Sequence, residues 1–324
     1  MKKVILSFLI TVLLLTGLIM FGGYSKIIDK LTSINLFLYG LAFISWTILN
    51  MILAIRIKHL LEYLGHRISY VDSFLTHMTG MLISDFTPAR VGYFIVPILL
   101  KKDHKIPINK GVLITLGPQM FEFIWKIMIS YLLLFLIMDK LDVNQLWMFI
   151  VAGIIGIVSL LFVVYLLLSE RGIKKFSFVK KIPLLDRIYD LFYKMQKNGH
   201  VLINEWRFII LTLIGAWLFK ALEWVLIAWS LNIHLFDNLV IEFVFYGSFQ
   251  SFISFLNFIP IPTLAGTGFS EGIAAGVLTL LGVPLPTAVL FSILARFDSV
   301  VIDVIFGIPK LEELRLKEIS KVIR

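Results

Sequence analysis

The 324 residues of this chain are 59% hydrophobic and only 16% charged, with a mean hydropathy of +0.94. Soluble domains are about half apolar and a quarter charged, so these values exclude an ordinary soluble protein and indicate one integral membrane domain over residues 1–324. The net charge of +9 does not indicate a nucleic-acid partner, because Lys and Arg cluster beside apolar spans, where they set orientation and contact anionic headgroups.

The apolar segments predict an all-α polytopic membrane protein with about six full transmembrane helices. Lys2 and Lys3 precede a run that is long enough to span and is followed by no small-residue cleavage site, so an uncleaved first helix is favoured over a signal peptide. Residues 22–35 are predicted to form a short loop. The full spans are predicted at 4–21, 36–55, 108–138, 146–168, 209–231 and 287–307.

Two further apolar segments are broken midway. In 71–100 the break runs from Ser84 to Gly92 around Pro88, which leaves arms of about 13 to 15 residues, whereas a span needs around 20. In 239–281 the break contains prolines and glycines. Broken backbone survives inside hydrocarbon only where protein or a water-filled cavity covers it. We therefore expect two re-entrant helical hairpins, with tips near Pro88 and at 262–268.

Orientation follows from the cations. If each broken segment enters and leaves by the same face, one side of the membrane carries 23 Lys and Arg and the other side 3. Positive loops stay inside, so we expect both termini in the cytoplasm of a cell-membrane protein, with the hairpins approaching from opposite leaflets. Opposed broken helices are typical of transporters and often come from an inverted repeat, although sequence similarity between the halves is too faint to establish one.

Residues 171–207 form the longest polar stretch, in which lysines precede apolar residues at helical spacing. This pattern predicts either a basic amphipathic helix on the inner leaflet or a linker helix that caps the bundle, and the spacing fits both. Residues 309–324 form a charged cytoplasmic tail.

Ionisable side chains fall inside the predicted spans, where each costs about 2.5 to 3.5 kcal/mol. Glu122 and Lys126 are four residues apart, so they share a helix face. Lys220 and Glu223 are three apart and do the same. Such pairs either fix helix packing or support a site. The set is Asp85, Arg90, Glu122, Lys126, Lys220, Glu223, Glu271, Arg296, Asp298 and Asp303.

A phosphate site is predicted at the second break. Ser270 and Glu271 open a new apolar run, so a helix N-terminus with unpaired N–H groups, which attract anions, is expected there. A guanidinium binds phosphate through two parallel hydrogen bonds. The alternative is that Arg296 is tied to Asp298 or Glu271 as a structural clamp. The predicted substrate-binding residues are Arg90, Gly266, Thr267, Gly268, Ser270, Glu271 and Arg296.

Catalytic and metal-binding patterns are missing from the sequence. It contains no HExxH, no GxSxG, no Walker A loop and no cysteine, and His77 stands alone on an apolar run. We therefore predict no catalytic residues, no metal and no cofactor.

The stretch from Pro260 to Glu271, followed by Gly282-Val-Pro284 and by Arg296, resembles the late signature of the lysylphosphatidylglycerol synthase transmembrane-region family, also called the flippase-like domain family. That signature is roughly P-x-P-G-G-x-G-x-x-E, then G-V-P, then R. The stretch from Thr87 to Gly92 is similar to the family's early Pro-Gly-Arg-x-Gly.

The chain also departs from this pattern. Leu264-Ala265 replaces the glycine pair, Tyr93 stands where a glutamate is common, and nothing after Glu122 matches the family's Arg and Asp. The resemblance implies an eight-helix-class membrane domain. In fused relatives the domain moves an aminoacylated phospholipid, and in stand-alone relatives it handles lipids or polyprenyl-phosphate-linked sugars. The soluble aminoacyl-transferase domain of the fused proteins is not found here, so lipid aminoacylation is not expected.

These observations together favour a flippase- or scramblase-like translocase for a phosphate-bearing lipid, either a phospholipid or a polyprenyl-phosphate-linked sugar. One alternative is a membrane-embedded enzyme that acts on lipid-linked phosphate with Glu271 or Asp298 as base. Another is a non-transporting subunit that recruits a glycosyltransferase or synthase through 171–207.

Overall fold

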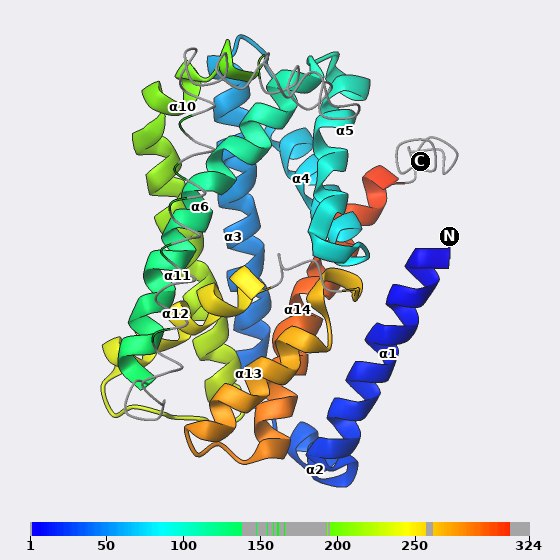
Figure 1. Cartoon of the computed structure of the whole chain (residues 1–324), viewed down its shortest axis with the longest axis vertical. Coiled ribbons are helices and arrows are strands. Elements are labelled where there is room, and N and C mark those ends of the chain that lie inside the picture. The colour runs from blue at the N-terminus through cyan, green and yellow to red at the C-terminus, as the bar shows by residue number, and fades with distance from the viewer. Residues whose placement is uncertain are drawn as a thin grey trace.

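The computed structural model describes residues 2–137, 195–256 and 262–311, with a few isolated positions between them. Every regular element in these ranges is helical (Figure 1). The span predicted at 146–168, most of 171–207 and all but the start of the 309–324 tail lie outside the described residues.

The described elements run in the following order. They are α1 (Lys2–Gly22), α2 (Tyr24–Thr32), α3 (Leu36–Tyr63), α4 (Tyr70–Asp85), the 3-10 helix η1 (Pro88–Phe94), α5 (Ile95–His104), α6 (Ile108–Ile137), α10 (His200–Asn204), α11 (Trp206–Ser230), α12 (Leu239–Leu256), the 3-10 turn η4 (Leu264–Gly266), α13 (Phe269–Leu280) and α14 (Leu285–Leu311).

Within these ranges, four helices are long and apolar enough to cross a membrane, namely α3, α6, α11 and α12, and α1 with α2 forms a fifth candidate bent by 82°. The chain is therefore an all-helical, multi-pass membrane protein, as predicted. The prediction of a loop at 22–35 is wrong, because these residues contain α2. This helix packs against α14, and Ile27 on it is buried.

The two broken segments form opposed hairpins (Figure 1). Helix α4 runs from one end of the bundle to mid-height, the chain turns through η1, and α5 returns to the same end. Helix α12 rises from the opposite end, and α13 returns to it from η4. The two tips touch, since the backbone N–H of Ala265 donates to the carbonyl of Thr87 at 3.1 Å.

The sequence explains the first turn locally. Pro88 begins η1, where its missing N–H costs nothing. A Cβ added at Gly92 would lie 2.5 Å from the carbonyl oxygen of Ile83, so only glycine allows this close approach. Arg90 has a φ of 55°, which is unusual for a residue other than glycine and costs on the order of 1 to 3 kcal/mol. Strained backbone of this kind concentrates at functional sites.

The second tip is held by α1. The N–H of Leu264 donates to the hydroxyl of Thr11 on α1 at 2.9 Å. Gly268 has a φ of 88°, and a Cβ on it would lie 2.5 Å from Leu14 of the same helix. The first helix therefore supports the break as well as crossing beside it.

The packing of 36–137 recurs in 206–311. Helices α3 and α11 pack against each other, α3 packs on α4 as α11 packs on α12, and α5 packs on α6 as α13 packs on α14. Across the halves, α4 packs on α14 and α12 on α6. If each helix of one half is replaced by its counterpart in the other half, the same pairs of helices remain in contact. The hairpins also enter from opposite ends, and two inverted repeats produce this arrangement.

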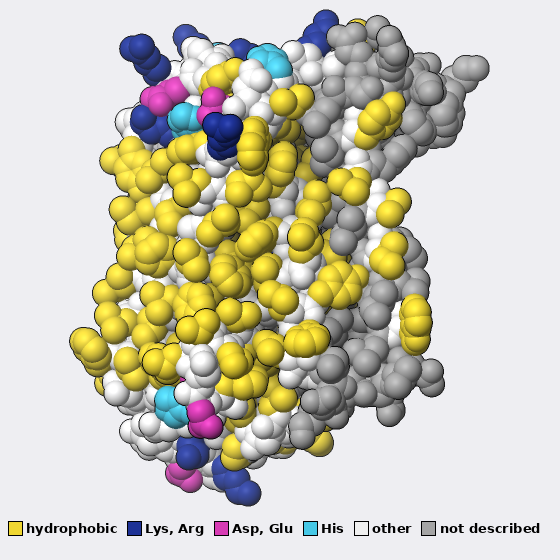
Figure 2. Space-filling model, turned by 90° about the vertical axis from the view of Figure 1, so that its left-hand side faces the viewer, with side chains coloured by type: hydrophobic (Ala, Val, Ile, Leu, Met, Phe, Trp, Pro, Cys, Tyr) yellow, Lys and Arg dark blue, Asp and Glu magenta, His cyan; other side chains and the backbone are white. Residues whose placement is uncertain are grey.

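The surface carries an apolar belt. Figure 2 shows hydrophobic side chains across the middle of one face, with charged and histidine side chains gathered at its two ends. Large apolar side chains such as Leu13, Phe21, Leu36 and Val240 are each more than 70% exposed. Such a belt would be unfavourable in water and suits contact with lipid.

Candidate functional site

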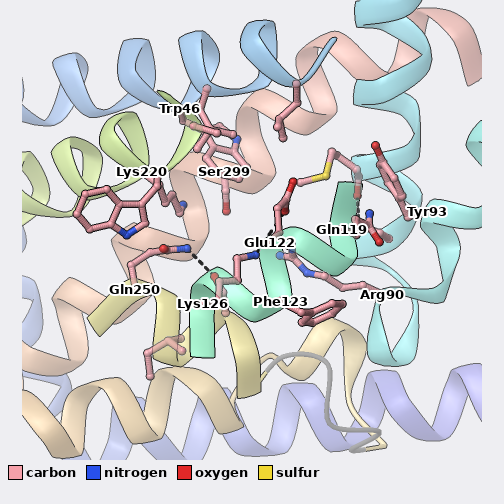
Figure 3. A pocket seen from close by; sticks show the side chains of 18 of the residues that line it. Trp46, Arg90, Tyr93, Gln119, Glu122, Phe123, Lys126, Lys220, Gln250 and Ser299 are labelled. Atoms are coloured by element: carbon pink, nitrogen blue, oxygen red, sulfur yellow. Dashed lines mark hydrogen bonds and ion pairs between the residues drawn. The ribbon is translucent and has the colours of Figure 1, made fainter. Parts of the chain in front are cut away.

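A cavity of about 380 Å³ lies between the hairpins and the long helices α3, α6, α11 and α14 (Figure 3). Its size falls in the range of ligand-binding pockets. Tryptophans from α3, α6 and α11 form much of its apolar wall. Five cations and two carboxylates also line it, so the wall is positively biased: Arg56, Arg90, Lys126, Lys220, Arg296, Glu122 and Glu271.

Arg296 is bound to the start of α13. Its Nε donates to Oε1 of Glu271 at 2.7 Å, and its Nη2 donates to the hydroxyl of Ser270 at 3.0 Å. The other carboxylate oxygen of Glu271 accepts the N–H of Gly268 at 2.6 Å. The clamp between Arg296 and Glu271, the alternative considered from the sequence, is therefore present.

The expectation of free N–H donors at this helix start is wrong for two residues. The N–H of Gly268 is used by Glu271, and that of Thr267 donates to the carbonyl of Leu264 at 2.8 Å. In a capping box, a side-chain carboxylate near the start of a helix accepts a backbone N–H of that same helix start. The carboxylate of Glu271 does this here, so it occupies the position that we predicted for a ligand anion.

Arg90 reaches the same cavity from the first hairpin. Its Nη2 lies 3.3 Å from Oδ1 of Asp85, while its Nε is buried without an acceptor among the described residues. Arg90 and Arg296, which the sequence placed together, both line the cavity. Figure 3 shows Arg90 pointing toward the space that Glu122 and Lys126 also face.

Glu122 has a partner that the sequence did not reveal. Arg56 Nη2 lies 2.6 Å from Glu122 Oε1, whereas Lys126 Nζ is 3.9 Å from Oε2. The span predicted at 36–55 stops short of Arg56, but α3 continues to Tyr63 and Arg56 is only 5% exposed. The sequence did contain a signal that the helix continues, because apolar residues recur at helical spacing after Arg56.

Lys220 forms its predicted ion pair with Glu223, at 2.7 Å. Its Nζ also lies 3.8 Å from the centre of the Trp46 ring, a cation–π contact. Lys220 lines the cavity, whereas Glu223, Asp298 and Asp85 lie behind the wall. Gly266, Thr267 and Gly268 also lie outside the set of lining residues, so of the predicted binding residues the cavity is reached by Arg90, Ser270, Glu271 and Arg296.

A histidine network was missed entirely. His77 is 1% exposed, with Nδ1 2.8 Å from the Tyr93 hydroxyl and Nε2 3.0 Å from Asn50 Oδ1. His77 and Tyr93 line the cavity. The partner of His77 at this position is therefore a hydroxyl group.

The profile of the lysylphosphatidylglycerol synthase TM region matches residues 4–307. The search of curated proteins and the search of solved structures each returned no match. The match covers both hairpins, all but the ends of α1 and α14 among the described long helices, and all the cavity residues named above. The chain therefore belongs to the lysylphosphatidylglycerol synthase TM-region family, whose members are membrane proteins linked to lipid function.

Proposed function

We propose that this protein moves a lipid with a phosphate-bearing headgroup across the bilayer and that the headgroup passes through the cavity between the hairpins. The observation that carries this proposal is that Arg56 and Arg90 line the cavity while three of their guanidinium nitrogens, Nε and Nη1 of Arg56 and Nε of Arg90, lie buried beneath its surface with no acceptor among the described residues. A buried donor without a partner costs about 1 to 3 kcal/mol, and more when charged.

Phosphate is the ligand class that suits these donors. Its oxygens accept the parallel hydrogen bonds that a guanidinium offers. All three arginines have a carboxylate partner, but Arg56 and Arg90 also carry buried nitrogens without an acceptor among the described residues, so they are the better candidates for direct contact. Lys126 and Lys220 on the same wall would add attraction for a negative charge.

The position of the cavity supports transport. A polar headgroup resists hydrocarbon, because its hydrogen bonds and charge lose their water there. A cationic cavity at mid-height of the bundle replaces that water, while the acyl or prenyl chains stay in the surrounding lipid. The contact between Ala265 and Thr87 lies where the headgroup would pass between the hairpins, so this contact would have to open.

The test is lipid translocation in liposomes with a fluorescent phosphatidylglycerol and an impermeant quencher. Arg56→Gln and Arg90→Gln should each slow translocation by roughly ten- to a hundredfold, because a hydrogen bond to a charged group is worth about 1.5 to 3 kcal/mol. Lys30→Gln, which changes an exposed lysine on α2, is the matched control and should leave the rate unchanged. Wild-type rates in both arginine variants would exclude this headgroup site.

A further inference from the structure

A chain of three hydrogen-bonded side chains ends at the cavity wall. Oδ1 of Asn50 on α3 lies 3.0 Å from Nε2 of His77 on α4. Nδ1 of His77 lies 2.8 Å from the hydroxyl oxygen of Tyr93 in η1. Asn50 is 0% exposed and His77 is 1% exposed. His77 and Tyr93 line the cavity, where Figure 3 labels Tyr93, so the hydroxyl that binds His77 belongs to this wall.

One backbone carbonyl fixes the direction of the bond between Asn50 and His77. The side-chain amide of Asn50 donates from Nδ2 to the carbonyl oxygen of Trp46 at 2.9 Å. A carbonyl oxygen only accepts, so the amide cannot be turned round, and the Asn50 atom that faces His77 is its oxygen. That oxygen also only accepts, so Nε2 of His77 carries a proton.

The imidazole of His77 is neutral in this arrangement. Both of its ring nitrogens are bound to uncharged groups, and a cation buried without a carboxylate partner is costly. In a neutral imidazole, the nitrogen without the proton accepts a hydrogen bond. The hydroxyl of Tyr93 therefore donates its only proton to Nδ1 of His77, and a ligand finds only lone pairs on the Tyr93 oxygen.

The Tyr93 oxygen is thus an acceptor that a ligand in the cavity can use. The two carboxylates on the same wall are engaged, Glu122 by Arg56 and Glu271 by Arg296. A ligand that binds the Tyr93 oxygen must bring a donor of its own, which is either a hydroxyl or an ammonium group. Five lining cations repel an ammonium, so an uncharged hydroxyl is the better fit.

This acceptor lies in the same short helix as one of the proposed phosphate ligands. Arg90 and Tyr93 are three residues apart in η1, and both line the cavity. The buried Nε of Arg90 has no acceptor among the described residues. In glycerol and sugar headgroups the hydroxyl groups follow the phosphate by only a few bonds, so a phosphate held by Arg90 would bring such a hydroxyl to Tyr93.

We propose that Tyr93 selects lipids in which a phosphodiester carries a hydroxyl-bearing headgroup, such as glycerol or a sugar. His77 is the positioning residue, because it holds the proton of the Tyr93 hydroxyl away from the ligand. The proposal rests on the proposed function and names the substrate class of that same cavity.

The first experiment compares two lipids that differ only in headgroup hydroxyls. Phosphatidylglycerol and phosphatidylpropanol share their charge, phosphodiester and acyl chains, but the propanol headgroup has no hydroxyl. Native mass spectrometry of the purified protein with equal amounts of both should show roughly three- to tenfold more bound phosphatidylglycerol, as expected for one hydrogen bond between uncharged groups. Tyr93→Phe should lose most of this preference. Equal binding to wild type, or an unchanged preference in Tyr93→Phe, would overturn the proposal.

Variants of His77 test the positioning role. His77→Leu removes the acceptor, so the Tyr93 hydroxyl can turn its proton to the cavity and the preference should fall although Tyr93 is still present. His77→Asn can place an amide oxygen near the position of Nδ1 and should keep more of the preference. The ratio of the two bound lipids is the readout, because a general loss of stability lowers both. Tyr24→Phe, at a tyrosine on α2 that is 62% exposed, is the matched control and should keep the wild-type ratio. The same ratio in His77→Leu as in wild type would contradict the positioning role.

Two further lipids define the donor. Phosphatidylinositol has a ring of hydroxyls like that of a sugar, so tighter binding than phosphatidylglycerol favours a sugar headgroup and weaker binding favours glycerol. Phosphatidylethanolamine bound more tightly than phosphatidylglycerol would overturn the choice of a hydroxyl.

Translocation of the same lipids in liposomes separates this proposal from the proposed function. If wild type binds and moves phosphatidylglycerol and phosphatidylpropanol equally, selection by Tyr93 fails while transport stands. If wild type binds phosphatidylglycerol preferentially but moves neither lipid, the proposed function fails while Tyr93 still selects a hydroxyl.

Discussion

At the scale of single residues, most charges inside this bundle come in opposite pairs, and several of these pairs join two segments. Arg296 and Glu271 connect α14 to α13, and Arg56 and Glu122 connect α3 to α6. Removing one member of a buried pair leaves an uncompensated charge, which costs more than removing both. These ion pairs therefore connect the helices that form the cavity wall, in addition to placing charged groups on it.

Arg296→Gln should lower the free energy of unfolding by about 3 to 5 kcal/mol, because Glu271 would remain buried without its cation. The double variant Arg296→Gln with Glu271→Gln should recover most of that loss, since a glutamine at 271 can still accept the N–H of Gly268. Thermal unfolding of both proteins in the same detergent measures the difference. Equal losses in the single and double variants would show that the pair contributes no coupling.

At the scale of elements, the turn of the first hairpin requires a glycine at position 92. The η1 segment packs so closely on the end of α4 that a side chain at Gly92 would collide with the backbone of Ile83. Backbone cannot move aside as a flexible side chain can. The shape of the tip, and with it the position of Arg90, therefore depends on one missing Cβ.

Gly92→Ala should destabilise the protein by about 1 to 3 kcal/mol and slow translocation, because η1 must shift away from α4. Gly17→Ala in α1 is the matched control, since a Cβ there meets nothing within 4 Å. Alanine in a helix is favoured over glycine by about 0.5 to 1 kcal/mol, so this control should be neutral or stabilising. Melting temperatures in detergent and the liposome assay read both effects, and equal behaviour of the two variants would contradict the close-packing account.

At the scale of the whole molecule, the two hairpin tips meet between the two ends of the bundle. In the described part of the tips, a backbone hydrogen bond from Ala265 to Thr87 joins them, and η1 packs against η4. Because the chain contains no cysteine, this contact can be locked by a disulfide without removing native thiols.

The double variant Thr87→Cys with Ala265→Cys should form a disulfide on oxidation, since residues joined by such a hydrogen bond have Cα atoms within bridging distance. Oxidation should stop translocation and reduction should restore it, because the tips could then part again. The single variant Thr87→Cys should ignore the oxidant. Undiminished transport through the locked protein would mean that the lipid does not pass between the tips.

Orientation is tested with single cysteines at exposed ends. Ser33→Cys, in the connection between α2 and α3, should react with an impermeant maleimide added outside intact cells. Arg67→Cys, in the connection between α3 and α4, should react only after the membrane is opened, because the cation distribution places it inside. The reverse pattern would invert the predicted topology.

Hydropathy and helix-breaking residues were sufficient to predict the membrane-spanning helices and the two hairpins from the sequence. Apolar runs of sufficient length, two runs cut by proline and glycine, and the cost of broken backbone in hydrocarbon together require covered, re-entrant hairpins. The family match and the described helices agree with that reading. These features are local or depend on the bilayer, so they can be read along the chain.

Only the tertiary structure shows which polar and charged side chains from distant parts of the chain contact each other. Arg56 binds Glu122 across 66 positions of sequence, and Trp46 donates to Asp303 across 257 positions. The site expected for an anion at the start of α13 is filled by the chain's own Glu271. Spacing along one helix predicts only neighbours on that helix, such as Lys220 and Glu223. Which charges face each other across the bundle depends on helix rotation and on the meeting of the hairpin tips, and packing sets both of these.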